Sequence, residues 1–387
     1  MATVSDRVKD IPPYLFSELQ IKKEELKKHG VDVIDLGIGA PDLPTPAFIC
    51  DRLSLEARKT ENHRYPPFSG TLEFKQAVAN FYEKRYQVKL NPHTEVLALI
   101  GSKEGIANLM QALINPGEKV LVPDPGYPVY RRAVGLAGGE AELFPLDPER
   151  GYIPQFDTIS DETKQNAKLM LLNYPNNPTA ATVELDVFKE AVAFSAANQL
   201  TLIHDAAYDL VTFNNYKAPS VLQVEDAKLH AVELGSLSKG FSMTGWRIGY
   251  IVGNQEVIQA LATLKSNIDS SQFLPIQLAA ATALTSDMST VKAYNAIYQT
   301  RSEKLYLALN KLGLETKKVK GTFFLWSKVP KGYTSDSFMT KLLNEAGIIA
   351  TPGTVFGPSG EGYIRFALTV AVERLDEVIN RLGQLKL

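Results

Sequence analysis

The sequence predicts an α/β protein whose centre is a mainly parallel β-sheet covered by helices. Short apolar runs alternate with helical patterns through the middle of the chain, and short apolar runs are typical of strands buried on both faces. Such alternation with helices favours a parallel sheet with helices on each side. The expected strands are Val96–Ile100, Lys119–Pro123, Lys168–Leu172, Leu200–His204, Leu229–Leu234 and Ile248–Val252.

Helical stretches connect these strands. Lys103–Leu113 follows the first strand directly, and Val187, Ala191 and Phe194 recur at helical spacing before the strand at 200–204. Parallel strands require a crossover of this kind, because a tight turn cannot join them.

The two ends of the chain have a different pattern and predict a second, smaller domain of the α+β kind. We expect residues 46–285 to form the large domain, and residues 1–45 together with 286–387 to form the small one. The N-terminal segment is expected to pack with the C-terminal part. The elements expected in the small domain are a charged helix at Tyr14–Lys28, strands at Val31–Leu36, Phe323–Ser327 and Tyr363–Leu368, and helices at Val291–Leu312 and Ala371–Leu385.

Composition excludes several classes of protein. The 387 residues are 45% apolar and 22% charged, which is ordinary for a globular enzyme. The formal net charge of -2 gives no general attraction to nucleic acid or to anionic lipid. Cys50 is the only cysteine, and the five histidines lack metal-binding spacing. With no apolar run of membrane length and no secretory-signal core at the start, we expect a cytoplasmic enzyme that binds neither a metal, a membrane nor nucleic acid.

The most informative motif lies at residues 236–247, directly after an expected strand. A lysine among small residues at a strand end, here Lys239, can bind a carbonyl group as a Schiff base. Ser236, Ser238 and Arg247 are the donor types that a phosphate needs. One small molecule that carries both groups is pyridoxal 5′-phosphate, which requires a lysine Schiff base and an acid near its ring nitrogen. The alternative interpretation is a polar turn.

Two further strand ends carry side chains that suit this cofactor. Ligands of open α/β sheets bind outside the carboxyl ends of the strands. Asp205 occupies such an end and could keep a pyridine nitrogen protonated, while Tyr208 could donate to the phenolic oxygen of the ring. Asn177, in the turn after another strand, is a second candidate donor to that oxygen. Taken singly, the Asp-x-x-Tyr motif is better explained by a turn that ends the strand, and a plain loop is the alternative interpretation for the segment of Asn177.

Three other positions complete the candidate site. Ser102 and Lys103 open an expected helix, whose N-terminal N–H groups favour a phosphate. Tyr127 follows a strand and could stack on the pyridine ring. Arg365 lies inside an apolar strand, where an arginine is costly unless it is paired. It is either a bidentate clamp for a substrate carboxylate or a member of an internal ion pair.

Taken together, the motifs resemble the class I/II, fold-type-I pyridoxal-phosphate-dependent aminotransferases over nearly the whole chain. Four segments carry the resemblance in order along the sequence. They are Gly-Tyr-Pro at 126–128, Asn-Asn-Pro-Thr at 176–179, Asp-Ala-Ala-Tyr at 205–208, and Ser-Leu-Ser-Lys followed by Met-Thr-Gly-Trp-Arg at 236–247. One departure is Ala180, where these enzymes usually have glycine.

The resemblance implies a role for each candidate residue. Lys239 would form the Schiff base and act as catalytic base, and Asp205 would contact the ring nitrogen. Tyr65 resembles the tyrosine that reaches the phosphate of the neighbouring subunit, which implies a homodimer. Asn177 and Tyr208 would hold the phenolic oxygen; Ser102, Lys103, Ser236, Ser238 and Arg247 would surround the phosphate; and Gly39 and Arg365 would bind the substrate carboxylate.

Within this group, several segments are similar to the LL-diaminopimelate aminotransferases. They are Pro12–Phe16, Val33–Gly39, Leu97–Gly105 and Val122–Tyr130. In that subgroup Tyr14, Lys103 and Tyr127 would lie near the substrate, and the expected reaction is transfer of an amino group from LL-diaminopimelate to 2-oxoglutarate in lysine biosynthesis.

Alternatives remain at this point. One is an aspartate- or alanine-type aminotransferase, and another is a different pyridoxal-phosphate enzyme such as a C–S lyase. A non-enzymatic regulator with this fold would need an added DNA-binding domain. A dinucleotide oxidoreductase would need a third glycine after Gly37 and Gly39, where the chain has Asp42.

Overall fold

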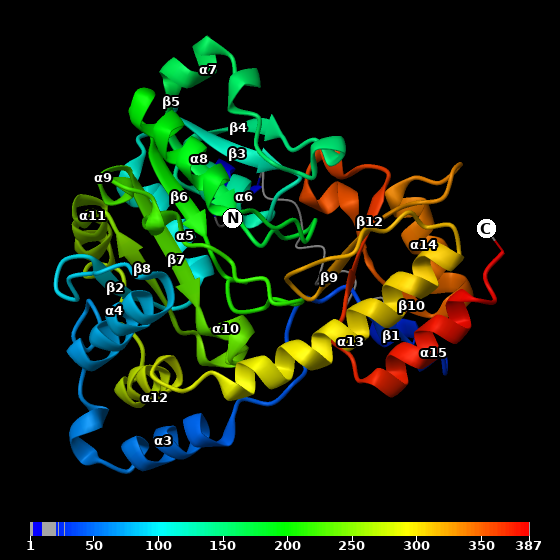
Figure 1. Ribbon diagram of the computed structural model, residues 1–387, viewed down its shortest axis with the longest axis horizontal. Helices are drawn as coiled ribbons and strands as arrows, with labels where there is room; N and C mark the ends of the chain where they lie inside the picture. The colour runs from blue at the N-terminus through cyan, green and yellow to red at the C-terminus, as the bar shows by residue number, and fades with distance from the viewer. Residues whose placement is uncertain (1–2, 10–20, 22, 27, 387) are drawn as a thin grey trace.

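The computed structural model describes residues 3–9, 21, 23–26 and 28–386. Its centre is a seven-stranded sheet with the strand order β2-β8-β7-β6-β5-β3-β4 (Figure 1). Strand β8 runs antiparallel to both of its neighbours, and the other adjacent pairs are parallel. The strands are β2 (Val96–Leu99), β3 (Lys119–Asp124), β4 (Glu140–Pro145), β5 (Ala167–Asn173), β6 (Thr201–Asp205), β7 (Ala231–Ser236) and β8 (Gly249–Gly253).

Helices cover both faces of this sheet, so its strands are buried on both sides. Successive residues of β5 point to opposite faces, as the period of a strand requires. Leu169 and Leu171 belong to one apolar core, and Met170 and Leu172 belong to the other. The helices of this part are α3 (Ala47–Ala57), α4 (Leu72–Tyr86), α5 (Ser102–Leu113), α6 (Val129–Leu136), α7 (Asp161–Asn166), α8 (Leu185–Ala197), α9 (Ala227–His230), α10 (Leu237–Gly240), α11 (Gln255–Lys265) and α12 (Leu274–Leu284).

A second, smaller part contains a three-stranded antiparallel sheet with its own apolar core (Figure 1). The N-terminal segment packs with it, because Ile34 and Asp35 pair with Ile348 and Ile349. The boundaries expected at residues 45 and 285 stay a prediction. Its elements are β1 (Ile34–Asp35), α13 (Ser289–Lys311), β9 (Phe324–Lys328), α14 (Ser335–Ala346), β10 (Ile348–Ile349), β11 (Thr351–Pro352), β12 (Tyr363–Ala367) and α15 (Val372–Leu382). The short helix α1 (Asp6–Lys9) instead contacts α6 of the larger part, where Arg7 donates to the carbonyl oxygen of Leu136 at 3.1 Å.

Local sequence explains where several helices begin and end. Helix α4 begins after Thr71, whose side chain accepts a hydrogen bond from the N–H of Phe74 at 3.2 Å. Helix α14 begins with a reciprocal capping box between Thr334 and Ser337, and it ends at Gly347 with a φ of 65°. These caps satisfy backbone groups that the helices leave unpaired.

The mainly parallel sheet is confirmed, but two expected strands need correction and one strand was missed. Strand β4 was not predicted. The strand expected to start at Leu229 starts at Ala231, because residues 227–230 form α9 and leave Leu229 66% exposed. The strand expected at residues 31–36 is only two residues long. Much of the helix expected at Tyr14–Lys28 lies outside the described residues. Among the helices that are described, none is long and apolar enough to cross a membrane.

Candidate active site

A cavity of about 520 Å³ lies at the carboxyl ends of the parallel strands, where open α/β sheets bind their ligands. Both parts of the molecule contribute side chains to it. The residues that line it are Ile38, Gly39, Ala40, Ser102, Lys103, Tyr127, Tyr130, Asn173, Asn177, Asp205, Ala207, Tyr208, Ser236, Ser238, Lys239, Thr244, Arg247, Phe324 and Arg365.

Lys239 extends from α10, the short helix that follows β7, into this cavity. Its Nζ donates a hydrogen bond to the carbonyl oxygen of Gly39 at 3.0 Å and lies 5.8 Å from the ring centres of Tyr208 and Phe323. Burial lowers the pKa of Lys239 to about 8, with a further lowering by the charges of Arg365 and Arg247. At neutral pH a lysine with this pKa is deprotonated in a far larger fraction of molecules than an exposed lysine, and the neutral amine is the form that acts as nucleophile and base.

Asp205 ends β6 and is buried in the same cavity as Lys239. The hydroxyl of Tyr130 donates to its Oδ2 at 2.8 Å, and the N–H of Ala207 donates to its Oδ1 at 3.2 Å. Burial raises the pKa of Asp205, while these two hydrogen bonds oppose that rise. A buried carboxyl with a raised pKa holds a proton or a cationic N–H partner strongly, as the role at a pyridine nitrogen requires.

The turn after β5 holds Asn177 in the cavity. Its backbone N–H donates to Oδ1 of Asn173 at 2.8 Å. Its side-chain Oδ1 accepts a hydrogen bond from Nη1 of Arg365 at 2.7 Å. Because the oxygen of the amide is used in this way, Nδ2 is the side-chain group of Asn177 that can donate to a ligand.

Arg365 brings a positive charge from the small sheet into the cavity. Besides Asn177, it donates to the carbonyl oxygen of Gly37 at 2.6 Å, and its guanidinium lies 4.2 Å from the ring centre of Phe324. A third acceptor is the hydroxyl of Thr351 at 3.3 Å, and these three neutral oxygens hold the guanidinium in place. Such a site suits a substrate carboxylate, because the planar guanidinium can bind both carboxylate oxygens.

Another part of the cavity is suited to an anion. Helix α5 begins at Ser102 after Gly101, which has a φ of 82°. A Cβ atom at Gly101 would overlap the guanidinium of Arg247, so this cation lies directly over the helix N-terminus. Burial and the neighbouring charges of Arg132 and Arg247 lower the pKa of Lys103. The concentrated positive charge and the helix dipole both favour a phosphate.

These groups fit pyridoxal 5′-phosphate. A phosphate is suited to the end formed by α5 and Arg247, an aldehyde to Lys239, and a ring nitrogen to Asp205. The absence of a Cβ at Gly101 leaves space for the guanidinium that this fit requires.

The structure brings together most of the candidate residues. Twelve of them line the cavity: Gly39, Ser102, Lys103, Tyr127, Asn177, Asp205, Tyr208, Ser236, Ser238, Lys239, Arg247 and Arg365. Tyr65 does not line it, and this residue is 89% exposed. Tyr14 lies outside the described residues. The roles assigned to these residues remain proposals.

Among the lining residues that sequence reasoning missed, Tyr130 and Asn173 are the two whose side chains donate hydrogen bonds to Asp205. Tyr130 lies three positions after Tyr127, and its ring contacts that of Tyr127 at a centre distance of 5.6 Å. Asn173 is the last residue of β5, a position equivalent to that of Asp205 on β6. The rule that ligands bind at strand ends could have identified Asn173. The departure at Ala180 has a structural counterpart, because this buried alanine adopts a φ of 57°, which costs about 1–2 kcal/mol relative to the usual backbone region.

Comparison with known proteins identifies the family. Residues 31–382 match the family model described as aminotransferase class I and II. The chain is 47% identical to an LL-diaminopimelate aminotransferase of Moorella thermoacetica, covering 97% of this chain and 96% of that one. It is 46% identical to the enzyme of the same name from Aquifex aeolicus over the full length of both. A solved structure titled substrate-bound BacF from Bacillus subtilis is similar with a TM-score of 0.96 and 37% identity, covering 99% of this chain and 98% of that one.

The fold and the cavity therefore define an enzyme that works with pyridoxal 5′-phosphate. The chain belongs to the class I and II aminotransferase family, whose members move amino groups between amino acids and oxo acids.

Proposed function

We propose that this aminotransferase moves the amino group of LL-diaminopimelate to 2-oxoglutarate, a reaction of lysine biosynthesis. The observation that supports this amino donor is the pair of full-length relatives that carry the name LL-diaminopimelate aminotransferase at 46–47% identity. Cytoplasmic location is part of the proposal, since both substrates are small metabolites.

The chemistry that pyridoxal 5′-phosphate supplies when bound is electron withdrawal from the Cα of the amino acid. Lys239 would accept the Cα proton of the amino acid on its neutral Nζ and would return a proton from the same atom. Its lowered pKa of about 8 keeps a substantial share of this amine neutral near physiological pH.

Other side chains hold the reacting molecules. Arg365 binds the substrate carboxylate and orients the Cα–H bond toward Lys239. The proton transfer then takes place between groups that are already held close together, which lowers its entropic cost. Asp205 keeps the ring nitrogen protonated by its charge. Asn177 would donate from Nδ2 to the ring oxygen, with Tyr208 as a second donor, and Arg247 and the N-terminus of α5 would bind the phosphate.

A panel of amino donors with 2-oxoglutarate tests the substrate. LL-diaminopimelate, aspartate, alanine and aromatic amino acids are compared by the glutamate that each produces. We expect kcat/KM to be highest for LL-diaminopimelate. A higher value for aspartate or alanine would overturn this amino donor and leave the aminotransferase assignment intact. Lys239→Ala protein purified in parallel controls for contaminating transaminases, because it must give no glutamate.

The same protein preparation also tests the alternative activity, that of a C–S lyase. A C–S lyase would release ammonia and a thiol from a thioether amino acid without any oxo acid. Glutamate formation that depends on 2-oxoglutarate, without thiol release from such a substrate, is the result expected for an aminotransferase.

We also propose that the enzyme works as a homodimer with shared sites. Tyr65 does not line the cavity of its own chain, and it is 89% exposed. The same loop leaves Phe68 51% exposed, and Leu72 follows at 52%. Phe273, which is 41% exposed, contacts the ring of His63 at 5.5 Å. Exposed apolar side chains gathered around one loop are typical of a protein interface, and two-fold pairing is the commonest symmetric assembly.

A further inference from the structure

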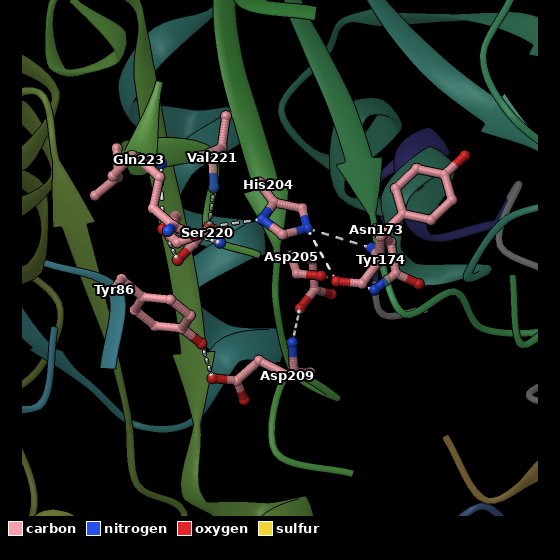
Figure 2. A network of polar contacts seen from close by, with 12 residues as sticks. Tyr86, Asn173, Tyr174, His204, Asp205, Asp209, Ser220, Val221 and Gln223 are labelled. Atoms are coloured by element: carbon pink, nitrogen blue, oxygen red, sulfur yellow. Dashed lines mark hydrogen bonds and ion pairs between the residues drawn. The ribbon is translucent and has the colours of Figure 1, made fainter. Parts of the chain in front are cut away.

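A buried pair of charged or polar side chains, Glu233 and His204, lies behind the active-site cavity and has no role in the scheme above. Glu233 belongs to β7 and His204 to the adjacent strand β6, and both are 1% exposed or less. The Nδ1 atom of His204 lies 2.7 Å from Oε2 of Glu233. Figure 2 shows the imidazole between Ser220 and Val221 on one side and Tyr174 on the other.

Hydrogen bonds hold the carboxylate of Glu233 on the side away from the cavity. Tyr82 and Ser220 donate their hydroxyls to Oε1, each at 2.7 Å, and the N–H of Val221 donates to Oε2 at 2.9 Å. Together with His204 these hydrogen bonds lower the pKa of Glu233 in spite of its burial. An acceptor-only carboxylate requires that Nδ1 of His204 carries a proton. The remaining nitrogen, Nε2, is therefore directed to the other side of the ring.

That nitrogen contacts the start of the turn that carries Asn177. Nε2 of His204 lies 3.3 Å from the backbone nitrogen of Tyr174 and 3.1 Å from its carbonyl oxygen (Figure 2). The preceding residue, Asn173, donates to the carbonyl oxygen of Asp205 at 2.7 Å and accepts from the N–H of Asn177. Buried hydrogen bonds thus connect Glu233 to His204 and His204 to Tyr174, and the neighbouring residue Asn173 is hydrogen-bonded to Asp205 and Asn177.

We propose that Glu233 and His204 are a pair of positioning residues that fixes the turn at 173–177, and thereby the side-chain amide of Asn177 beside Arg365. Neither residue lines the active-site cavity, and the pair acts through the backbone of Tyr174. The inference rests on the aminotransferase activity of the family and not on the identity of the amino donor. The tests therefore use whichever amino donor is fastest in the panel.

The main variant is His204→Asn. The Nδ2 of asparagine can replace Nδ1 of the imidazole and keep Glu233 bonded, but the shorter side chain does not reach Tyr174. We expect the unfolding temperature to stay close to that of the wild type. We expect kcat to fall at least about tenfold, because the turn that carries Asn177 loses its contact with residue 204 and small displacements of active-site groups are costly. Unchanged kcat would overturn the proposal.

Two measurements besides activity follow the cofactor itself. The dissociation constant of pyridoxal 5′-phosphate, measured by equilibrium titration of the apoprotein, should rise. The pH midpoint of the visible absorption of the bound cofactor should move upward by about half a unit or more, because the ring oxygen loses a donor that favours its anionic form. An unchanged midpoint and an unchanged dissociation constant would each count against the proposal.

Tyr82→Phe is the matched control. It removes one hydrogen bond from Glu233 on the side away from His204 and leaves the contact with Tyr174 in place. If the pair only stabilises the fold, His204→Asn and Tyr82→Phe should both lower the unfolding temperature, and neither should change kcat or the absorption midpoint. A positioning role predicts that only His204→Asn changes the cofactor measurements.

Glu233→Gln distinguishes position from charge. Glutamine can accept from His204 and Val221 with its oxygen and donate to the hydroxyls of Tyr82 and Ser220 with its nitrogen. We expect kcat within about threefold of the wild type; a loss equal to that of His204→Asn would overturn the positioning role. If His204→Asn does not fold, the double variant His204→Phe with Glu233→Gln replaces it, since no buried charge is then left without a partner.

Discussion

Lys239 combines a lowered pKa with a position where its charge is poorly solvated. Its pKa of about 8 in the folded protein is below the unfolded value of 10.5. The folded state therefore binds fewer protons between these values, and holding the ammonium in the cavity lowers the stability of the fold. This penalty is at its full size below pH 8 and disappears as the pH rises from about 8 to 10.5.

The first prediction concerns Lys239→Met with the cofactor removed. At pH 7 the variant should have a higher free energy of unfolding than the wild-type apoprotein, and the difference should shrink by pH 9.5. Urea unfolding at both pH values measures it. A difference in stability that grows with pH would contradict the predicted direction of the pKa shift.

The variant should have no transaminase activity at any pH. Borohydride reduction of the wild-type holoenzyme should place the pyridoxyl group on Lys239.

The second prediction compares Asp205→Ala with Tyr130→Phe. Removal of the carboxylate should slow turnover by about 10²–10³-fold, the usual effect of losing a placed electrostatic group. Loss of the Tyr130 hydroxyl removes one hydrogen bond to that carboxylate, at 2.8 Å, and should cost about tenfold. Single-turnover kinetics with a saturating amino donor measure the rate of the chemical step in both variants. Near-normal turnover of Asp205→Ala would refute the role of Asp205.

At the scale of elements, strands and helices with strong apolar patterns were predictable. The expected strand at residues 119–123 is observed as Lys119–Asp124, and the expected helix at residues 291–312 as Ser289–Lys311. Strand β4 was missed because it lies at the sheet edge, pairs only with β3, and has one buried residue, Phe144. An edge strand of this kind lacks the apolar run of a central strand.

The candidate site was predictable wherever a residue follows a strand in a recognisable motif. Asp205 and Lys239 are such residues, and both line the cavity. Tyr130 and the pair of His204 and Glu233 were missed because their contacts join residues 29 to 75 positions apart in the chain. No local pattern encodes a hydrogen bond between residues that lie so far apart in the sequence.

The third prediction concerns the N-terminus of α5. Gly101→Ala should weaken binding of pyridoxal 5′-phosphate, because its Cβ would displace the guanidinium of Arg247 and its φ of 82° is unfavourable for alanine. Gly117→Ala is the control, because Gly117 has a φ of 84° and a Cβ there would lie more than 4 Å from its surroundings among the described residues. Both variants should lose about 1–3 kcal/mol of stability. Equal affinity for the cofactor in the two variants would contradict the prediction.

At the scale of the whole molecule, the position of Tyr65 gives the fourth prediction. Lys239→Ala and Tyr65→Ala subunits are each expected to be nearly inactive as pure dimers. If Tyr65 completes the neighbouring site, a mixed dimer has one site with both changes and one site with neither. Random exchange makes about half of the dimers mixed, so about a quarter of wild-type site activity should return.

Activity of the mixture is measured after subunit exchange has been shown with differently tagged chains. Activity that does not exceed the sum of the two parent preparations would place Tyr65 in its own subunit's site. A chain that sediments as a monomer at assay concentration would reject the homodimer itself.

The close approach of Gly39 to the ring of Phe324 limits how this enzyme can evolve a new substrate range. A Cβ at Gly39 would lie 2.6 Å from Cζ of that ring, and the carbonyl oxygen of Gly39 already accepts from Lys239. Ile38, by contrast, is 40% exposed and lines the same cavity. In a library randomised across residues 38–40, every active clone should keep the glycine, and altered selectivity should arise on either side of it.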